Sequence, residues 1–281
     1  MENEFDKAKT PGLFSEEETE VELAALDSVL DSVKALVARG AMFVVNHSGG
    51  KDSQAMFHYV LGMVPMEQIM VVHAVLPEVE WDGVLEHIQA TTLGLKVHTC
   101  RSRRILIEMI RERGMFPSPT QRQCTSDLKR GPIERTIRQS GHKLIVNCMG
   151  MRAEESPNRA KLKTLKFSEK NSKNGREWYD WLPIQDWSVG EVFAKIASVG
   201  QVPHWAYALG MSRLSCCLCI MSSKADLTIA AKHNPKLYRT YVDLEHSTGQ
   251  VMMMPSKTKG RLTLEQVTGV IAKTEAELAT L

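Results

Sequence analysis

The chain has 281 residues, of which 43% are hydrophobic and 24% charged, and its formal net charge is +2. This length suits one large α/β domain with an appendage or two small domains, and the composition is that of a globular protein. The net charge is too small to argue for a nucleic-acid partner, and no apolar run reaches the roughly 18 residues of a bilayer span. Because the first residues are acidic where a signal peptide is basic and then apolar, we expect a cytoplasmic protein without membrane association.

Residues 1–15 contain Pro11 and Gly12 and show no periodicity, which predicts a flexible lead-in. Apolar residues then recur at helical spacing from Leu26 to Val37, and Gly40 predicts the end of this helix. The following elements alternate in type: strand 41–46, helix 52–62, strand 69–75, helix 81–93, strand 96–100, a helix through 105–110 and strand 144–150. This alternation predicts an α/β fold with a doubly wound, mostly parallel sheet.

The pattern changes after residue 150. Residues 152–175 are polar and basic, which predicts a long functional loop. A short strand at 182–184 is expected to dock among Trp178, Trp181 and Trp187, which pack in the core. The rest of the chain predicts a largely helical C-terminal part, with helices at 188–198, 223–232, 235–246 and 263–279.

The most informative stretch follows the strand at 41–46 and reads Asn46-His47-Ser48-Gly49-Gly50-Lys51-Asp52-Ser53. Its paired glycines can adopt backbone angles closed to other residues and expose successive N–H groups, to which the helix start adds partial positive charge. Ser48 and Ser53 supply hydroxyls, Lys51 a point charge, and Asp52 a carboxylate suited to magnesium on phosphate oxygens. The stretch lacks the spacing of a Walker A motif, and it predicts an exposed phosphate-binding loop.

A second loop, from Gly150 to Arg159, follows the strand predicted at 144–150. Loops at the carboxyl ends of parallel strands converge on one crevice, so we expect this loop to face residues 48–53 across a nucleotide. Arg152 and Arg159 suit phosphate or sulfate oxygens, and Glu155 is expected beside them in the nucleotide site. A solvated charged loop is the alternative, and it weighs more for Arg159 than for Arg152.

The six cysteines are more typical of thiols or metal ligands than of disulfides in such a chain. Cys216 and Cys219 form a Cys-x-x-Cys pair, which can hold a metal ion that a distant thiol, Cys124, completes. The pair is equally typical of a redox couple or of packed thiols. Cys217 is a candidate fourth ligand or sulfur carrier. The cysteines on predicted strands are expected to be packed core thiols: Cys100 and Cys148.

Four blocks together resemble the phosphoadenosine phosphosulfate reductase family of the PP-loop ATP pyrophosphatases: 48–53, 124–129, 150–156, and 182–188 with the Cys-x-x-Cys pair. The resemblance spans about residues 40 to 220 and implies an adenine nucleotide α-hydrolase-like sheet. The sequence departs from the family reductases, which carry a catalytic cysteine in a C-terminal tail and generally lack the Lys-Asp pair of the loop. No cysteine follows Cys219 here, while Lys51 and Asp52 are present, which favours ATP as substrate. The Asp-Thr-Gly that usually ends the second strand is replaced around Val75 to Glu78.

The resemblance therefore implies ATP-dependent adenylylation coupled to sulfur transfer, as in relatives that thiolate tRNA or phosphorothioate DNA. Lys51, Asp52 and Arg152 are the expected catalytic residues, with ATP, magnesium and an iron–sulfur cluster, or alternatively zinc, as cofactors. A sulfur-donor protein and a nucleic-acid acceptor are the expected partners. The alternatives are a sulfonucleotide reductase or sulfate adenylyltransferase-like enzyme, and a nucleotide-binding regulator without turnover. We expect a nucleotide-binding domain over 16–175 and a mainly helical, cysteine-bearing part over 176–281.

Overall fold

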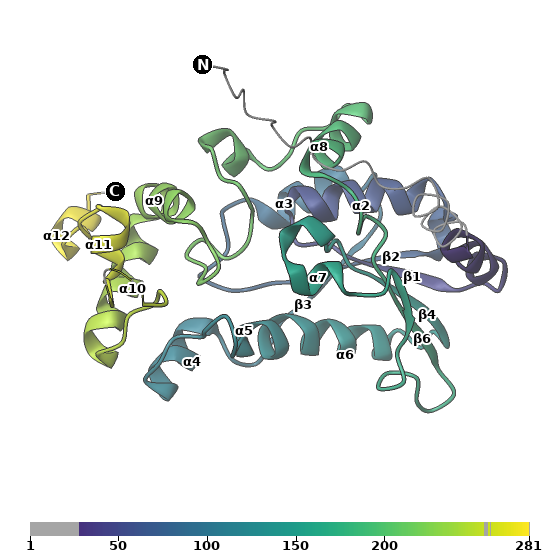
Figure 1. The fold of residues 1–281 in the computed structure, drawn as a ribbon, viewed down its shortest axis with the longest axis horizontal. Coiled ribbons are helices and arrows are strands. Elements are labelled where there is room, and N and C mark those ends of the chain that lie inside the picture. Colours follow the sequence, from purple (N-terminus) through teal and green to yellow (C-terminus); the bar gives the residue numbers. More distant parts are fainter. Residues whose placement is uncertain (1–27, 256–257, 259, 281) are drawn as a thin grey trace, which may run out of the picture.

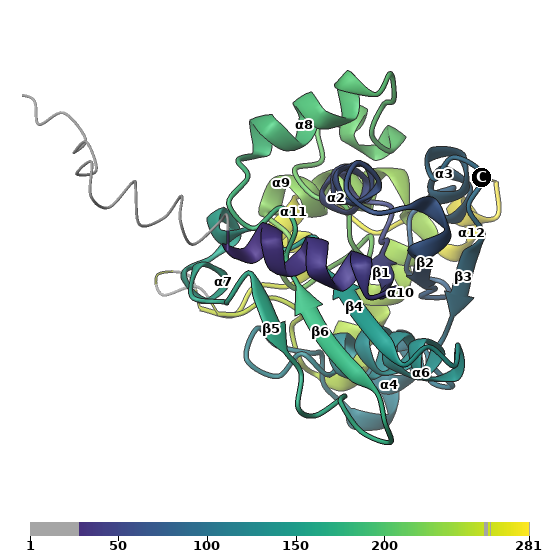
Figure 2. The ribbon, with the colours of Figure 1, turned by 90° about the vertical axis from the view of Figure 1, so that its right-hand side faces the viewer.

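The computed structural model describes residues 28–255, 258 and 260–280 (Figure 1), so the predicted lead-in at 1–15 and the start of the first expected helix lie outside the described residues. Six strands form one sheet in the order β3-β2-β1-β4-β6-β5, and only the β5–β6 pair is antiparallel. Figure 2 shows them side by side, with β3 and β5 at the edges. The sheet confirms the predicted doubly wound, mostly parallel α/β fold. The strands are β1 Met42–Asn46, β2 Ile69–Ala74, β3 Val97–Cys100, β4 Leu144–Cys148, β5 Leu165–Phe167 and β6 Glu177–Trp181.

Helices cover both faces of this sheet (Figure 1). One face carries α2 Lys51–Leu61, α3 Val84–Thr91 and α8 Val189–Ser198, and a short η1 Met66–Gln68 leads into β2. The other face carries α4 Leu106–Arg113 and a continuous helical stretch of α5 Gln123–Thr125, η2 Ser126–Arg130 and α6 Gly131–Gln139.

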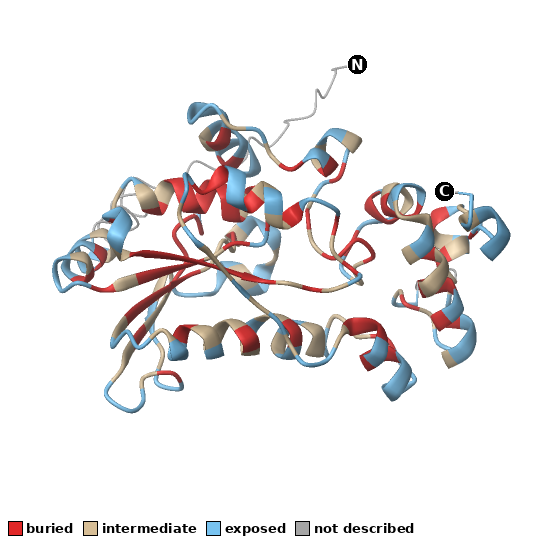
Figure 3. Cartoon of the chain, turned by 180° about the vertical axis from the view of Figure 1, so that it is seen from behind, coloured by how far each residue is buried: buried red, intermediate tan, exposed pale blue. Residues whose placement is uncertain are grey.

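Side chains of β1 alternate between the two faces, as expected for a strand. Phe43 and Val45 belong to the larger core on the α2 side, whereas Val44 packs with Ile137 of α6. Because both faces are covered, the central strands are buried along most of their length (Figure 3).

Residues 152–184 differ from the expectation of a long loop followed by a strand. The loop contains η3 Ala153–Glu155, α7 Pro157–Ala160 and β5. The strand expected at 182–184 is wrong, because β6 ends at Trp181 and the chain turns at Pro183, which has no N–H for a sheet ladder. Since β6 pairs with β4, the sheet continues past residue 175, where the domain boundary was expected.

The last helices of the chain gather at one end of the molecule (Figure 1). They are α9 Lys224–His233, α10 Pro235–Thr248, α11 Leu264–Thr268 and α12 Glu275–Leu278, whereas η4 Trp205–Leu209 lies beside the segment that leads into α3, where the Trp205 indole N–H donates to the Asp82 carbonyl (3.0 Å). The single helix expected at 263–279 is wrong, because Gly269 ends α11 in the left-handed conformation and Thr274 caps a new helix. Among the described helices, none has both the length and the apolar character needed to cross a membrane.

Candidate active site

A cavity of about 270 Å³, the main cavity, lies at the carboxyl ends of β1, β2 and β4. It is lined by the PP-loop (residues 48–53), the end of β2, the loop after β4 and residues 213–215. In the strand order β1 has β2 on one side and β4 on the other, and such a switch point is where doubly wound sheets bind ligands.

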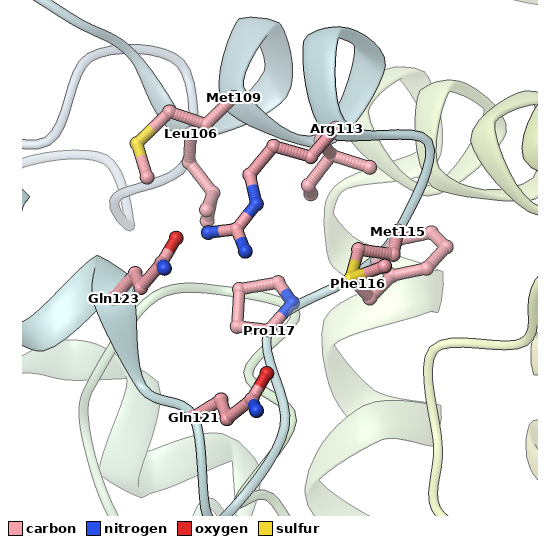
Figure 4. A pocket seen from close by; sticks show the side chains of 9 residues that line it. Leu106, Met109, Arg113, Met115, Phe116, Pro117, Gln121 and Gln123 are labelled. Carbon is pink, nitrogen blue, oxygen red and sulfur yellow. The ribbon is translucent and has the colours of Figure 1, made fainter.

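A second hollow lies between α4 and the segment that leads to α5, where Arg113 extends toward Pro117 and Gln123 (Figure 4). It encloses only about 10 Å³, which is room for no more than a single water molecule. The main cavity, which lies at the switch point of the sheet and is lined by PP-loop residues, is the candidate active site.

The PP-loop is held by its own short-range hydrogen bonds. The Ser48 N–H donates to Ser53 Oγ (3.1 Å), the Ser53 hydroxyl donates to the Gly50 carbonyl (2.9 Å), and the Gly49 N–H donates to His47 Nδ1 (3.1 Å). Gly49 has a φ of 77°, and a Cβ there would lie 2.9 Å from Val84 Cγ1, so only glycine fits.

The helix start of α2 opens onto the main cavity. Gly50 precedes the helix and has no side chain to cap it, and the Lys51 N–H of the first turn donates to the Tyr207 hydroxyl (3.0 Å). The N–H groups of a first helical turn have no acceptor within the helix, and they carry the positive end of the helix dipole. Asp52 and Ser53 of this turn line the cavity together with Ser48. The arrangement suits a phosphate or another oxyanion.

Lys51 does not line the main cavity. Its side chain is 3% exposed, so the expectation that it lies on an exposed loop is wrong. The first turn of α2 directs its ammonium group to the Ser212 carbonyl (3.2 Å), to Asp52 Oδ2 (3.1 Å) and over the Tyr207 ring. The Tyr207 hydroxyl in turn accepts hydrogen bonds from the N–H groups of Lys51 (3.0 Å) and Leu214 (3.1 Å). Lys51 and Tyr207 thus fasten the PP-loop to the 207–214 segment.

Arg152 is also turned away from the main cavity. Its Nε donates to Asp52 Oδ1 (2.7 Å), and its Nη1 donates to the Trp187 carbonyl (3.1 Å) and to Glu154. The loop after β4 can approach this closely because Gly150 packs on the backbone of Asp52, where a Cβ would lie 3.2 Å from the carbonyl oxygen. Asp52 therefore lies between two cations, and each of its carboxylate oxygens already accepts a bond from one of them.

Two arginines line the main cavity, Arg159 and Arg213. Arg159 pairs with Glu155, which also accepts a hydrogen bond from the Arg152 N–H (3.0 Å). Burial lowers the pKa of Arg159, and the positive charges of Arg213 and Arg122 lower it further. Arg213 has no ion-pair partner among the described residues. The excess of positive charge at this wall favours an anionic ligand.

The three cysteines predicted to share a metal lie around a separate small space, the cysteine cavity. Cys124, Cys216 and Cys219 line it together with Phe116 and Tyr241, and it encloses about 30 Å³. Burial raises the pKa of the Cys216 thiol to about 11. Within the described part of the chain, no three His, Cys, Asp or Glu side chains have an arrangement that could hold a metal ion. The thiols therefore share a cavity without metal-ligand geometry.

The other cysteines lie outside the cysteine cavity. Cys217 is buried, and its N–H donates to the Val79 carbonyl (2.8 Å). Cys148 lies on β4 and is fully buried, while Cys100 at the end of β3 is half-buried. Lys129 lines the main cavity, and the electrostatic influence of Cys216 raises its pKa.

The family model for the phosphoadenosine phosphosulfate reductase domain matches residues 42–222. The chain belongs to this family. An uncharacterized 37.8 kDa protein of Escherichia phage 186 is 31% identical over 118 residues, which cover 41% of this chain and 34% of that protein. The chain thus matches about a third of the length of that relative.

Two solved structures are similar to this member of the phosphoadenosine phosphosulfate reductase family. The phosphoadenylyl-sulfate reductase from Candida auris, in a phosphate complex, has a TM-score of 0.48 at 12% identity and covers 74% of this chain and 98% of its own. The FMN adenylyltransferase of Candida glabrata, in complex with FMN and an ATP analog, has a TM-score of 0.40 at 14% identity and covers 62% of this chain and 53% of its own.

The family match covers the residues that line the main cavity, whereas Tyr241 of the cysteine cavity lies beyond it, and the match ends before α9. Membership of the phosphoadenosine phosphosulfate reductase family supports a nucleotide-binding, sulfonucleotide-related function.

Several residues of the candidate active site were not predicted from the sequence. His73 lies within an apolar run that is typical of a buried strand, and Tyr207 is far from the PP-loop along the chain. The residues that the sequence reasoning missed are His47, His73, Glu80, Lys129, Tyr207 and Arg213.

Proposed function

We propose that the chain is an enzyme that adenylylates an acceptor with ATP and couples this step to sulfur transfer. The observation that carries the proposal is that Ser48 and the first turn of α2, with Asp52 and Ser53, share the main cavity with Arg159 and Arg213. An anion-binding helix start and two cations around one space suit a polyphosphate better than a neutral ligand.

In the proposed reaction, a nucleophile of the acceptor attacks the α-phosphorus of ATP. The bond from that phosphorus to the bridging oxygen breaks, and pyrophosphate leaves with the negative charge. The N–H groups of Asp52 and Ser53, the Ser48 and Ser53 hydroxyls and Arg159 stabilise this charge as it develops. Asp52 fits poorly as a magnesium ligand in this arrangement, because both its oxygens are engaged by Lys51 and Arg152, so no step is assigned to the metal.

The sulfur-transfer half of the proposal rests on the cysteine cavity. An iron–sulfur cluster would supply sulfur, whereas zinc would be structural, and Cys124, Cys216 and Cys219 are the proposed ligands. Because these thiols lack metal-ligand geometry, no step is derived through a cluster.

Measuring the metal and sulfide content of anaerobically purified protein tests this half of the proposal. Cys124→Ser and Cys216→Ser should lower the metal content, and Cys100→Ser is the matched control that should not. Full metal occupancy in the Cys124→Ser, Cys216→Ser double variant would exclude this site.

Pyrophosphate release from ATP tests the adenylylation. The protein is incubated with ATP, a sulfur-donor protein and either tRNA or DNA as acceptor, and pyrophosphate is measured. We expect release that depends on the acceptor and falls at least a hundredfold in Asp52→Asn, because that change removes the carboxylate that orients Lys51 and Arg152. Asp243→Asn, on the exposed face of α10, is the matched control. Wild-type turnover in Asp52→Asn would remove the proposed site.

A sulfonucleotide reductase is the second candidate, and one observation favours it. The Lys51 ammonium lies outside the main cavity, so the cavity lacks the point charge expected for β and γ phosphates. A reductase would release sulfite from phosphoadenosine phosphosulfate in the presence of a thiol donor, whereas a nucleotide-binding regulator would turn over neither substrate. The two assays together separate the three possibilities.

A further inference from the structure

The segment between β3 and β4, residues 101–143, carries a strong excess of positive charge. It contains eleven Lys and Arg residues against four Asp and Glu, a net charge of +7, whereas the whole chain carries only +2. Ten of the eleven cations are exposed, and nine of these ten are arginines. We call the exposed Lys and Arg side chains of residues 101–143 the basic surface. The charge of the chain is therefore concentrated on one segment rather than spread evenly.

The basic surface follows the helices that cover the sheet face opposite α2. In this segment α4 is followed by the continuous stretch of α5, η2 and α6 (Figure 1). Ile110 of α4 and Ile137 of α6 are buried, whereas Arg111 and Arg135 on the same helices are exposed. At 1.5 Å per residue the stretch over 123–139 is about 25 Å long. Duplex DNA carries about fifteen phosphate charges over that length.

Most cations of the basic surface have no counter-charge. Only Arg130 and Arg138 have an ion-pair partner among the described residues, and both pair with Glu134, at 4.0 and 3.5 Å. A solvated protein surface ordinarily mixes charges of both signs. Like charges that are not neutralised repel one another, and an anionic partner relieves this repulsion. The basic surface therefore fits a polyanion better than it fits bulk water.

The basic surface borders the main cavity. Lys129 and Ile133 line that cavity, while the neighbouring Arg130 is exposed. Arg122, which precedes α5, lies close enough to Arg159 for its charge to lower the pKa of Arg159. A polyanion bound along these helices would thus run past the cavity in which ATP is proposed to react.

The side chains of the segment favour duplex DNA over other polyanions. The planar fork of arginine matches two phosphate oxygens at once. RNA loops and single strands are recognised mainly through unpaired bases that stack on aromatic rings. Phe116 is the one Phe, Tyr or Trp among residues 101–143, and it is buried. The basic surface therefore offers contacts to a phosphate backbone and no ring on which a base could stack.

We propose that the basic surface binds the phosphate backbone of duplex DNA, irrespective of base sequence, and presents the duplex to the main cavity as the acceptor. Binding stands on the charge and placement of residues 101–143 alone. Presentation as the acceptor rests on the proposed function.

Fluorescence anisotropy of the full chain without ATP tests the binding. The probes are two duplexes of about 30 base pairs with different sequences, one of the single strands, and tRNA, each over a range of sodium chloride concentrations. We expect the logarithm of the association constant for the duplexes to fall with the logarithm of the salt concentration with a slope of about −4 or steeper. We expect both duplexes to bind within about twofold of each other, and at least about threefold more tightly per nucleotide than the single strand or tRNA.

The double variant Arg111→Gln, Arg135→Gln removes two exposed cations that have no ion-pair partner among the described residues. We expect it to make the salt slope shallower by about two and to weaken duplex binding at least about tenfold. The matched control is Lys224→Gln, Lys232→Gln, which removes the same charge from exposed positions of α9 and should leave the slope unchanged. Thermal unfolding checks that both variants are folded.

The outcomes separate this inference from the proposed function. An unchanged slope in the folded arginine variant, an equal loss in the lysine control, or tighter binding of the single strand or tRNA would overturn the duplex DNA surface. Pyrophosphate release with tRNA by a protein that does not bind duplex DNA would overturn this inference and leave the proposed function standing. Binding of both duplexes with the expected slopes, by a protein that releases no pyrophosphate with any acceptor, would support the surface and overturn the proposed function.

Discussion

The PP-loop and the cysteine cavity differ in how far apart in the chain their parts lie. The hydrogen bonds within the PP-loop join residues no more than six positions apart, as between His47 and Ser53, and Lys51 adds contacts to Tyr207 and Ser212. The cysteine cavity brings together Cys124, Cys216 and Tyr241, and the ring of Tyr241 packs 6.2 Å from that of Phe116. The PP-loop is thus shaped mainly by local backbone geometry, whereas the cysteine cavity exists only when α4 and α10 have packed together.

The strongest test of the local organisation is Gly49→Ala. A left-handed residue with a side chain is strained, and the new Cβ also meets Val84, so we expect a loss of about 2 to 5 kcal/mol in the free energy of unfolding. Gly40→Ala is the matched control, because Gly40 has a φ of 74° and nothing within 4 Å of the added Cβ, which leaves backbone strain of about 1 to 2 kcal/mol. Urea unfolding measures both. Equal losses would show that the PP-loop tolerates the side chain.

A second change tests whether the PP-loop depends on long-range contacts as well. Lys51→Ala removes the buried ammonium that joins Asp52, Ser212 and Tyr207, and we expect it to lower the free energy of unfolding by about 2 to 3 kcal/mol. Lys232→Ala, at an exposed position of α9, should change the free energy of unfolding by less than about 0.5 kcal/mol. A loss in Lys51→Ala as small as in the control would mean that the loop is held by its local bonds alone.

The acid dependence of stability provides a third test. The pKa of His47 is about 3 in the folded protein, below the ordinary 6.5, so the unfolded chain binds more protons between these values and stability falls as the pH drops from 6.5 toward 3. For His47 this amounts to about 2 kcal/mol between pH 7 and pH 5. We expect His47→Gln to remove this part of the loss, measured by urea unfolding at both pH values. If the free energy of unfolding fell by the same amount between pH 7 and pH 5 in His47→Gln as in the wild-type protein, His47 would be protonated in the folded state.

The smallest expected effect belongs to the cysteine cavity. The buried Tyr241 hydroxyl has no hydrogen-bond partner among the described residues, so Tyr241→Phe removes a desolvated polar group without removing the ring. We expect a gain of about 1 kcal/mol in the free energy of unfolding. Tyr238→Phe is the control, because the Tyr238 hydroxyl bonds Thr268 Oγ1 (2.8 Å) and the Val270 carbonyl (2.9 Å), and its loss should destabilise. Destabilisation by Tyr241→Phe would indicate a partner for its hydroxyl within the cysteine cavity.

Sequence reasoning succeeded where the signal is local. The PP-loop, the alternation of strands and helices and the parallel sheet all follow from short-range patterns, since a glycine turn after an apolar run and a helical period are set by neighbouring residues. It failed at the helix expected over 263–279, although Gly269 and the capping Thr274 were visible signals for a break. The last strand was also predicted too far along the chain, at 182–184, whereas β6 is Glu177–Trp181. These residues are recognisable as a strand only from their pairing with β4.

The sequence by itself determined that a glycine loop joins a strand and a helix of a doubly wound sheet, and that the protein belongs to the phosphoadenosine phosphosulfate reductase family. Only the tertiary structure decided which side chains face the main cavity: Lys51 and Arg152 turn away to hold Asp52, while His47, His73 and Glu80 line the wall. The physical reason is that motif spacing specifies the path of the backbone, whereas the direction of a charged or polar side chain depends on partners from distant segments. For Lys51 and Arg152, those partners are Ser212, Tyr207 and Trp187.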